Sequence, residues 1–277
     1  MNAHLTLALQ AKSPADFAAM QAKLPGLVPA LYKAGDAMGT VHYCRFIAFG
    51  ADTVYLLADV DGEVETALEA LPKYFGAVLE PLLAHVKDAP PTPLASSAAT
   101  FSKWANQHHL KAAVGYENYR GVSVSRVKSL AANAGITFDV ATAQQLPLLV
   151  MMPMKGRLAT VTLQAGLKVL RGLLYKGADG VGTAHFAHLV EMPNNYVAFF
   201  TVYDGPYDKY AQDFAEQMGP AFDLIFAFVN DAPATPTSKN VAPFTQWVME
   251  HNLKPLAFYS AYPGLQVADI KALLADG

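Results

Sequence analysis

Apolar and polar positions along the first half of the chain follow two different periods. From Leu5 to Leu9 every second residue is leucine, which predicts a short strand. Between 14 and 34 the apolar residues recur at steps of three and four, which predicts a helix disturbed by Pro25 and Pro29. Apolar runs over 40–49 and 53–60, separated by Gly50-Ala51-Asp52, then predict a β-hairpin.

The clearest helical pattern runs from Val64 to Val86, where apolar residues again recur at helical spacing. Asp61 precedes it, where we expect the N-cap of this helix. A proline-rich loop ends the pattern. The remaining predicted elements are a short helix carrying Phe101, Trp104 and His108, a strand ending at Tyr116, and a helix over 123–133.

The two halves of the chain are copies of one another. Shifting the sequence by 143 residues aligns them without a gap, and 37 of the 131 aligned pairs are identical. Unrelated sequences of this composition would give on the order of ten. Gly39-Thr40-Val41-His42, for example, matches Gly182-Thr183-Ala184-His185. We therefore predict repeat 1 over 1–134, repeat 2 over 147–277 and a linker over 135–146.

The order of elements in each repeat predicts the fold class. Repeat 2 shows strands at 148–152, 183–192 and 196–203, a helix over 158–175, and Asp204 in the position of Asp61. The order β-α-β-β-α-(α)-β-α is the split βαβ, ferredoxin-like arrangement. The prediction is an α+β protein of two tandem ferredoxin-like repeats, whose sheets pack face to face as an α+β barrel within one chain.

Composition narrows the class of protein. Apolar residues make up 53% of the chain and charged residues 16%, with a net charge of −3. These values exclude a disordered chain and a nucleic-acid binder that works by bulk charge. The single cysteine, Cys44, excludes an internal disulfide and a multi-cysteine metal site, and its mid-strand position argues against a nucleophile. We find no secretory signal and no stretch of about 18 uncharged apolar residues, and we expect a cytoplasmic protein without a membrane span, either a monomer or a homodimer.

The duplicated pattern resembles the dimeric α+β barrel superfamily, which includes dye-decolourising peroxidases, chlorite dismutases and small monooxygenases. The segment 40–46, followed by Asp61-Gly62, is also similar to uncharacterised bacterial proteins with a His-Phe-Ala-Arg-type strand. The resemblance implies an oxidoreductase that uses haem or no cofactor. The peroxidase motif Gly-x-x-Asp-Gly is not matched, because Gly177-Ala178-Asp179-Gly180 is one residue too short. We therefore assign no residue of this chain, on the basis of a motif, as the peroxidase family's catalytic aspartate or as a haem ligand.

His42 and His185 are the first candidate site residues, because they occupy equivalent strand positions. In a cavity, either could ligate haem iron or act as an acid or base. The alternative is a buried histidine bonded to its neighbours. Strand alternation places Thr40, His42, Cys44 and Phe46 on one face, with Tyr43 and Arg45 on the other, where Arg45 could stabilise a peroxide-derived charge. His188 lies three residues after His185, on the opposite face, so these two cannot share a metal on a regular strand.

Aromatic and histidine side chains at the helix ends form a second group of candidates. His108 and His251 each lie four residues after a tryptophan, so a haem ligand beside an aromatic wall (Trp104, Trp247) is one interpretation. The alternative is a histidine that interacts with the C-terminal helix dipole. Four tyrosines near strand-to-helix turns could line a ligand mouth or serve in packing; they are Tyr116, Tyr119, Tyr259 and Tyr262. Lys33 with Asp36, and Lys176 with Asp179, suggest either an anion site or a solvated ion pair.

Two functions from different classes stay open on the sequence. The first is a haem-dependent, peroxidase-like or cofactor-free oxidoreductase that acts on a small hydrophobic or aromatic substrate in the barrel cavity. The second is a non-catalytic protein that binds a small hydrophobic molecule. The sequence contains no Walker loop, dinucleotide fingerprint, nucleophile elbow or His-Glu-x-x-His motif. Their absence argues against nucleotide, dinucleotide, serine-hydrolase and zinc-protease chemistry.

Overall fold

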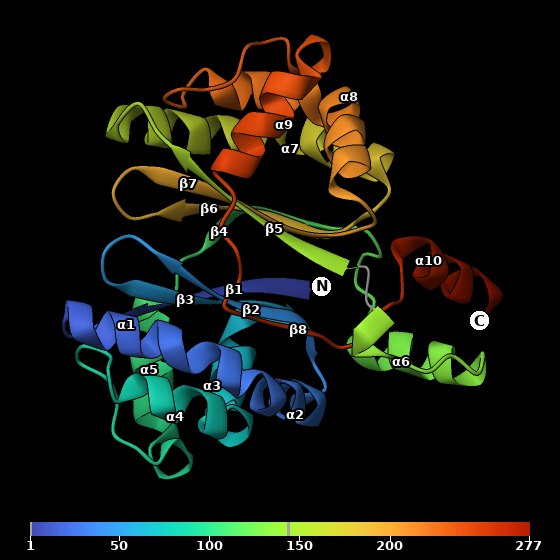
Figure 1. Ribbon diagram of the computed structural model, residues 1–277. Coiled ribbons are helices and arrows are strands. Elements are labelled where there is room, and N and C mark those ends of the chain that lie inside the picture. Colours follow the sequence, from blue (N-terminus) through green and yellow to red (C-terminus); the bar gives the residue numbers. More distant parts are fainter. Residues whose placement is uncertain (1, 143–144) are drawn as a thin grey trace. The chain divides into compact units, whose positions relative to one another are not determined.

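The computed structural model describes residues 2–142 and 145–277, and its contacts divide the chain into two compact units (Figure 1). Unit 1 comprises Met1–Lys111, Arg120–Thr137 and Lys254–Tyr262. Unit 2 comprises Ala112–Tyr119, Phe138–Leu253 and Pro263–Gly277. Each unit contains an antiparallel sheet covered by helices on one face, so the predicted α+β class with two ferredoxin-like repeats is confirmed. That the two sheets form a barrel stays a prediction.

The sheet of unit 1 has the strand order β1-β3-β2-β8. Its strands are β1 (Asn2–Gln10), β2 (Val41–Phe49), β3 (Thr53–Asp61) and β8 (Ala257–Ser260). The helices of this unit are α1 (Pro14–Lys23), α2 (Val28–Met38), α3 (Val64–Tyr74), α4 (Gly76–Leu83), α5 (Ala98–His108) and α6 (Val124–Asn133). The leucines of β1 are fully buried, as the alternating pattern predicted.

The sheet of unit 2 has the equivalent order β5-β7-β6-β4. Its strands are β4 (Ala112–Glu117), β5 (Gln145–Pro153), β6 (Ala184–Met192) and β7 (Tyr196–Asp204). Its helices are α7 (Arg157–Val181), α8 (Tyr207–Phe226), α9 (Val241–Glu250) and α10 (Val267–Asp276). Short 3₁₀ turns are present at Leu24–Leu27, Leu94–Ser96, Val140–Thr142 and Thr237–Lys239. No helix of the described residues is long and apolar enough to cross a membrane.

The fourth strand of each sheet comes from the other sequence repeat. β8 lies in repeat 2, yet it pairs with β2, and Cys44 lies opposite Tyr259 in that pair. β4 lies in repeat 1, yet it pairs with β6, and Tyr116 lies opposite Ala187. Each unit therefore draws on both repeats. The predicted linker, 135–146, includes residues 143–144, which lie outside the described residues.

The predicted helices differ between the repeats in where they break. The first predicted helix of repeat 1 is divided into α1, a 3₁₀ turn and α2, because Pro25 and Pro29 stand at the starts of the second and third segments. Its equivalent α7 contains no proline and runs unbroken for 25 residues. The second predicted helix is divided at Phe75 into α3 and α4, whereas α8 is continuous.

A β-bulge occurs at each predicted strand histidine. Val41 pairs with Val60 and Tyr43 with Asp59, so His42 is the extra residue of β2. His185 is the extra residue of β6 in the same way, between Ala184 and Phe186. The prediction that strict alternation would align His42 with Cys44 and Phe46 is therefore wrong, because a bulge interrupts the two-residue period and redirects the side chain.

Candidate functional site

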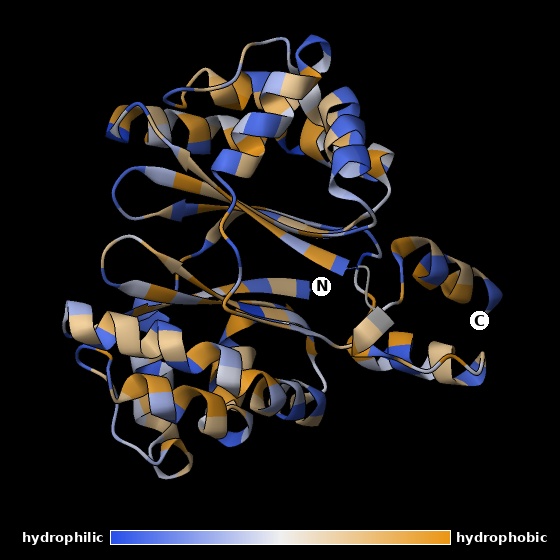
Figure 2. Cartoon of the chain, viewed as in Figure 1, coloured by the Kyte–Doolittle hydropathy of each residue, from blue (hydrophilic) through white to orange (hydrophobic). Residues whose placement is uncertain are grey.

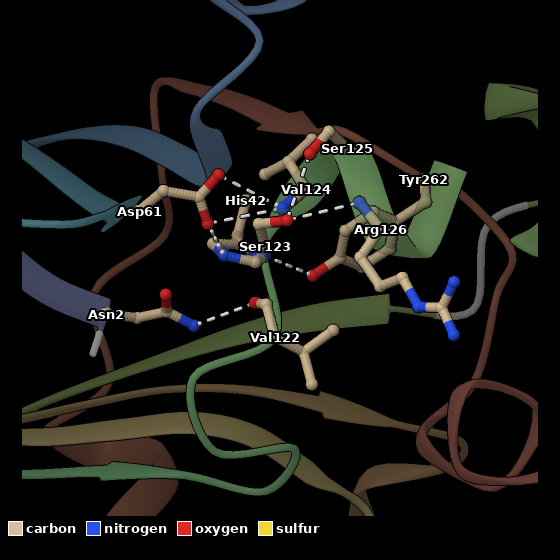
Figure 3. A network of polar contacts seen from close by, with 9 residues as sticks. All are labelled: Asn2, His42, Asp61, Val122, Ser123, Val124, Ser125, Arg126 and Tyr262. Atoms are coloured by element: carbon tan, nitrogen blue, oxygen red, sulfur yellow. Dashed lines mark hydrogen bonds and ion pairs between the residues drawn. The ribbon is translucent and has the colours of Figure 1, made fainter. Parts of the chain in front are cut away.

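His42 lies at the centre of a buried polar network in unit 1 (Figure 3). Its Nδ1 lies 2.7 Å from the Tyr262 hydroxyl, and its Nε2 lies 2.9 Å from Oδ1 of Asp61. An ionised Asp61 can only accept a hydrogen bond, so the N–H of Nε2 donates to its carboxylate. Nδ1 then accepts the hydrogen bond that the Tyr262 hydroxyl donates. The His42 side chain has no exposed surface. Both of its ring nitrogens are therefore engaged inside the fold.

Asp61 connects this histidine to a helix far away in the sequence. The backbone N–H of Val124, the first residue of α6, donates to both carboxylate oxygens at 3.1 and 3.2 Å. The partial positive charge of a helix N-terminus favours a carboxylate in this place. The prediction that Asp61 caps the following helix is wrong, because Glu63 is the N-cap residue of α3. The Asp61 carboxylate instead joins β3 to α6.

Unit 2 repeats this arrangement. The Tyr119 hydroxyl lies 3.1 Å from Nδ1 of His185, whose Nε2 lies 2.7 Å from Oδ1 of Asp204. The Val267 N–H, at the start of α10, donates to Oδ2 of Asp204 at 2.7 Å. Asp204 was also expected to be an N-cap, and that prediction is wrong, because Pro206 is the N-cap residue of α8.

Each network ties an exchanged segment to the unit that receives it. Tyr262 follows β8 and belongs to repeat 2, but it binds His42 of repeat 1. Tyr119 follows β4 and belongs to repeat 1, but it binds His185 of repeat 2. The backbone N–H of Ala261 also donates to the carbonyl of His42 at 2.9 Å. We call these two arrangements the Tyr–His–Asp clamps, defined by Tyr262, His42 and Asp61 in unit 1 and by Tyr119, His185 and Asp204 in unit 2.

The other two predicted tyrosines also hold exchanged strands. The Tyr259 hydroxyl donates to Asp36 at 3.0 Å, and the Tyr116 hydroxyl donates to Asp179 at 2.9 Å. Burial and the neighbouring Asp36 raise the pKa of Tyr259. Asp36 also pairs with Lys128 at 2.9 Å, so its ion pair is with α6. These contacts fit the packing interpretation of the tyrosines.

His108 and His251 lie at helix ends against tryptophan rings. The His108 ring stacks on Trp104 with centroids 4.5 Å apart, and the His251 ring stacks on Trp247 at 4.1 Å. Nδ1 of each histidine lies 2.8 Å from the carbonyl oxygen of the same tryptophan. These contacts fit the helix-end interpretation.

Haem does not fit His42 or His185 as they lie. Iron requires a ring nitrogen with a free lone pair, and the clamps engage both nitrogens of His42 and of His185. The cavities described below are also far smaller than a haem macrocycle. We derive no chemistry through haem for this reason.

Arg45 belongs to a buried charged cluster in unit 1. Its Nη1 donates to Oδ2 of Asp59 at 2.9 Å, and the other carboxylate oxygen lies 2.9 Å from Nδ1 of His4. Nε2 of His4 lies 3.0 Å from the Thr6 hydroxyl. Within the part of the chain that the structure describes, Nε and Nη2 of Arg45 meet no hydrogen-bond acceptor. Sequence reasoning identified Arg45 but missed His4 and Asp59, which reach it only through strand pairing.

Cys44 is fully buried beside this cluster. Burial raises its pKa, so the thiol stays protonated at neutral pH. The structure therefore agrees with the expectation that Cys44 is not a nucleophile.

Two adjoining apolar cavities lie within unit 2. Their volumes are about 30 and about 20 Å³. Phe199, Tyr210, Phe214 and Phe222 line both of them. The smaller cavity is further lined by Leu148, Val150, Met152, Tyr207, Ala211, Phe226, Phe244, Trp247 and Val248. Of the predicted ligand-lining residues, Trp247 and Tyr116 line one cavity each. The aromatic residues of α8 recur at helical spacing, and that spacing alone did not mark them as the wall of a cavity.

These features define an α+β protein of two ferredoxin-like repeats with exchanged strands and an aromatic cavity in one unit. No protein-family model matches the chain, and no curated protein matches it.

Among solved structures, the chain is similar to two proteins named "putative monooxygenase". The one from Lactobacillus acidophilus has a TM-score of 0.41 at 9% identity, over 95% of this chain and 97% of that one. The one from Fusobacterium nucleatum has a TM-score of 0.38 at 8% identity, over 96% of each chain. An anthrone oxidase-like protein gives 0.33 at 9% identity, over 95% of each chain. Likeness at this level carries no argument about activity.

Proposed function

We propose that the protein binds a small, flat, apolar or aromatic molecule in the paired cavities of unit 2. The observation that carries this proposal is the wall of the smaller cavity, where every lining residue has an apolar or aromatic side chain. Ligand pockets for such molecules are lined in this way, with few polar groups. The cavities together offer space for a few atoms only, so binding requires the shared aromatic rings to move.

The aromatic wall is particular to repeat 2. Tyr210, Phe214, Phe222 and Phe226 align with alanine or leucine in repeat 1, at Ala67, Leu71, Leu79 and Leu83. The rings contact one another edge to face: Phe214 and Phe222 have centroids 4.8 Å apart, and Phe199 and Phe222 have centroids 5.4 Å apart. An inserted aromatic ligand can make the same kind of contact, worth roughly 0.5–1.5 kcal/mol per ring pair beyond area burial.

Three residues of this wall carry a polar group: Tyr207, Tyr210 and Trp247. The Tyr207 hydroxyl donates to the carbonyl of Thr245 at 2.9 Å, and the Tyr210 hydroxyl is buried without a partner among the described residues. The indole N–H of Trp247 is buried and meets no acceptor among the described residues. A ligand with one carbonyl or hydroxyl oxygen could accept this hydrogen bond, so the favoured class is an aromatic or alicyclic molecule with a single oxygen substituent.

Tryptophan fluorescence tests this proposal directly, because the chain has two tryptophans. The Trp104→Phe variant leaves Trp247 as the only reporter, and Trp247→Phe leaves Trp104 at the equivalent place in repeat 1. We expect 1-naphthol to change the emission saturably in Trp104→Phe and not in Trp247→Phe. Equal responses of both variants, or no response of either, would refute the proposal.

A cavity-filling variant gives a second test. Ala211 lines the smaller cavity and aligns with Leu68 in repeat 1. Ala211→Leu adds volume to the cavity wall, and we expect 1-naphthol affinity to fall at least tenfold. Ala242→Leu on α9 is the control, because that side chain is exposed and lines neither cavity; its affinity should equal that of the wild type.

A second candidate function, haem-free oxidation of a small aromatic substrate, rests on Arg45. Nε and Nη2 of the buried Arg45 guanidinium meet no acceptor among the described residues, so they can stabilise an anion that forms during a reaction with O₂, and His4 can exchange a proton nearby. Oxygen uptake with anthrone and 1-naphthol, without added haem, tests this function. Arg45→Lys keeps the charge but not the paired N–H donors. We expect it to lower the rate of oxygen uptake at a temperature at which thermal unfolding shows the variant to be folded. Oxygen uptake equal to the buffer blank would eliminate this candidate.

A further inference from the structure

The outer face of α7 carries apolar side chains that the fold does not cover. Leu158 and Val169 are 81% and 85% exposed, and Val161 and Leu173 are also exposed. Their spacing of three, eight and four residues places them on one stripe of the helix, opposite the side buried by Leu163, Leu167 and Leu174. Figure 2 shows hydrophobic residues distributed along this helix. We call Leu158, Val161, Val169 and Leu173 the α7 stripe.

Positive charge accompanies the α7 stripe. Arg157, Arg171 and Lys176 are exposed on this helix, and its only acidic residue is Asp179 near the C-terminal end. The Tyr116 hydroxyl already donates to Asp179, and Gln164 bonds to Glu191 at the side of the helix. Among the side chains described on this helix, an occupant therefore meets an apolar stripe flanked by Arg157, Arg171 and Lys176, of which Arg171 also donates to the Tyr175 hydroxyl at 3.4 Å.

The stripe is absent from repeat 1. Leu158, Val161, Val169 and Leu173 align with Ala15, Ala18, Gly26 and Ala30. In repeat 1 the same stretch is also broken by Pro25 and Pro29 and contains Asp16 in its first turn. The long, apolar and basic outer face therefore distinguishes repeat 2.

We infer that the α7 stripe docks on an anionic lipid surface, with the helix lying in the plane of the interface. A helix of this kind buries its apolar side chains at the headgroup boundary, while the neighbouring cations attract anionic lipids. A second copy of this chain is the less favourable occupant, because pairing α7 with itself would bring its arginines and lysines together with their like charges. The inference concerns the outer side of α7 and does not depend on the cavities.

Vesicle flotation with the full chain tests this inference. The probe is a vesicle of equal parts phosphatidylglycerol and phosphatidylcholine, compared with phosphatidylcholine alone. We expect flotation with the anionic vesicles only, and a loss of at least tenfold in the partition coefficient on raising NaCl to 0.5 M.

Two double variants separate the apolar from the charged contribution. Leu158→Ser with Val169→Ser, and Arg157→Gln with Arg171→Gln, should each lower the partition coefficient at least tenfold. The matched control is Ala15→Ser with Gly26→Ser, the equivalent exposed positions of repeat 1, and it should bind as the wild type does. All substituted side chains are exposed, and circular dichroism checks that each variant keeps its helix content.

Three outcomes would overturn the inference. The first is that the wild type does not float with anionic vesicles. Binding of an acidic protein in place of the vesicles would also count against the inference. The second is equal binding by the wild type and both double variants. The third is a concentration-dependent dimer, seen by light scattering, that the Leu158→Ser and Val169→Ser substitutions abolish, because the stripe would then bind a second copy.

Discussion

The Tyr–His–Asp clamps show what a buried histidine does in this protein. Each imidazole satisfies both nitrogens inside the fold, and each carboxylate also receives the N–H of a helix start. The sequence singled out the paired histidines and also the four residues around them, but it expected Asp61 and Asp204 to cap helices and left the roles of Tyr119 and Tyr262 open. It did not show that Tyr262 reaches His42, because 220 residues separate them. That contact exists only once β8 has joined the sheet of unit 1.

Removing a clamp hydroxyl should destabilise the fold. Tyr262→Phe and Tyr119→Phe each leave a buried histidine nitrogen without its partner, which costs roughly 1–3 kcal/mol. Urea unfolding measures the loss. Tyr74→Phe, at a half-buried tyrosine of α3, is the control and should cost less than either. The clamps would have no stabilising role if all three variants unfolded at the same urea concentration.

Tyr203 should make the fold sensitive to alkaline pH. Burial, and secondly the nearby Asp208, raise its pKa to about 12. An unfolded tyrosine ionises near pH 10, so between about pH 10 and 12 the unfolded state loses the proton first and stability falls as pH rises. Tyr203→Phe should therefore flatten the fall in unfolding free energy over this window. An unchanged slope in urea titrations at pH 9, 10 and 11 would contradict this assignment.

At the scale of elements, the same repeat pattern gives different helices. Proline positions predicted the break of the first helix correctly, because proline at a helix start is favoured and inside a helix is not. The bulges at His42 and His185 could not be predicted from alternation, because one extra residue leaves no mark in the apolar pattern. The close approach of α7 to α8 was equally invisible in the sequence.

Substitutions of glycines on α7 test how closely this helix packs against α8. A Cβ at Gly177 would lie 2.4 Å from Sδ of Met218 and 2.8 Å from the carbonyl of Gln217, both on α8. Gly177→Ala should therefore destabilise the protein by about 1–3 kcal/mol. At Gly166 and Gly172 a Cβ meets nothing within 4 Å, so alanine there should stabilise by roughly 0.5–1 kcal/mol. Thermal unfolding distinguishes these opposite signs, and three shifts of the same sign would show that the two helices are not in close contact at Gly177.

At the scale of the whole molecule, the exchange of β4 and β8 is the principal finding. Both sheets have the same strand order, and in both the last strand comes from the other repeat. Such long-range pairings carry a large loop-closure cost before they contribute contacts. Each repeat therefore lacks, on its own, the strand that completes its sheet.

The two repeats should associate when they are produced as separate chains. We expect tagged 1–134 to retain untagged 147–277 at equal stoichiometry after co-expression, because each supplies the fourth strand of the other's sheet. Tyr262→Phe in 147–277 should weaken this association by removing a clamp bond. Two fragments that remain separate, folded monomers would show that each repeat can close its sheet with its own strand.

The sequence by itself determined the duplication, the order of elements and the α+β class, because these depend on periodicity and local propensity. The tertiary structure alone decided which strand completes each sheet, since β4 and β8 carry the same local pattern whichever edge they join. It also decided that His42 and His185 are held by tyrosine and aspartate, and that the aromatic rings of α8 leave cavities in one unit. These outcomes depend on pairings between residues far apart in the chain, and such pairings are fixed by packing and geometry that no local stretch of sequence specifies.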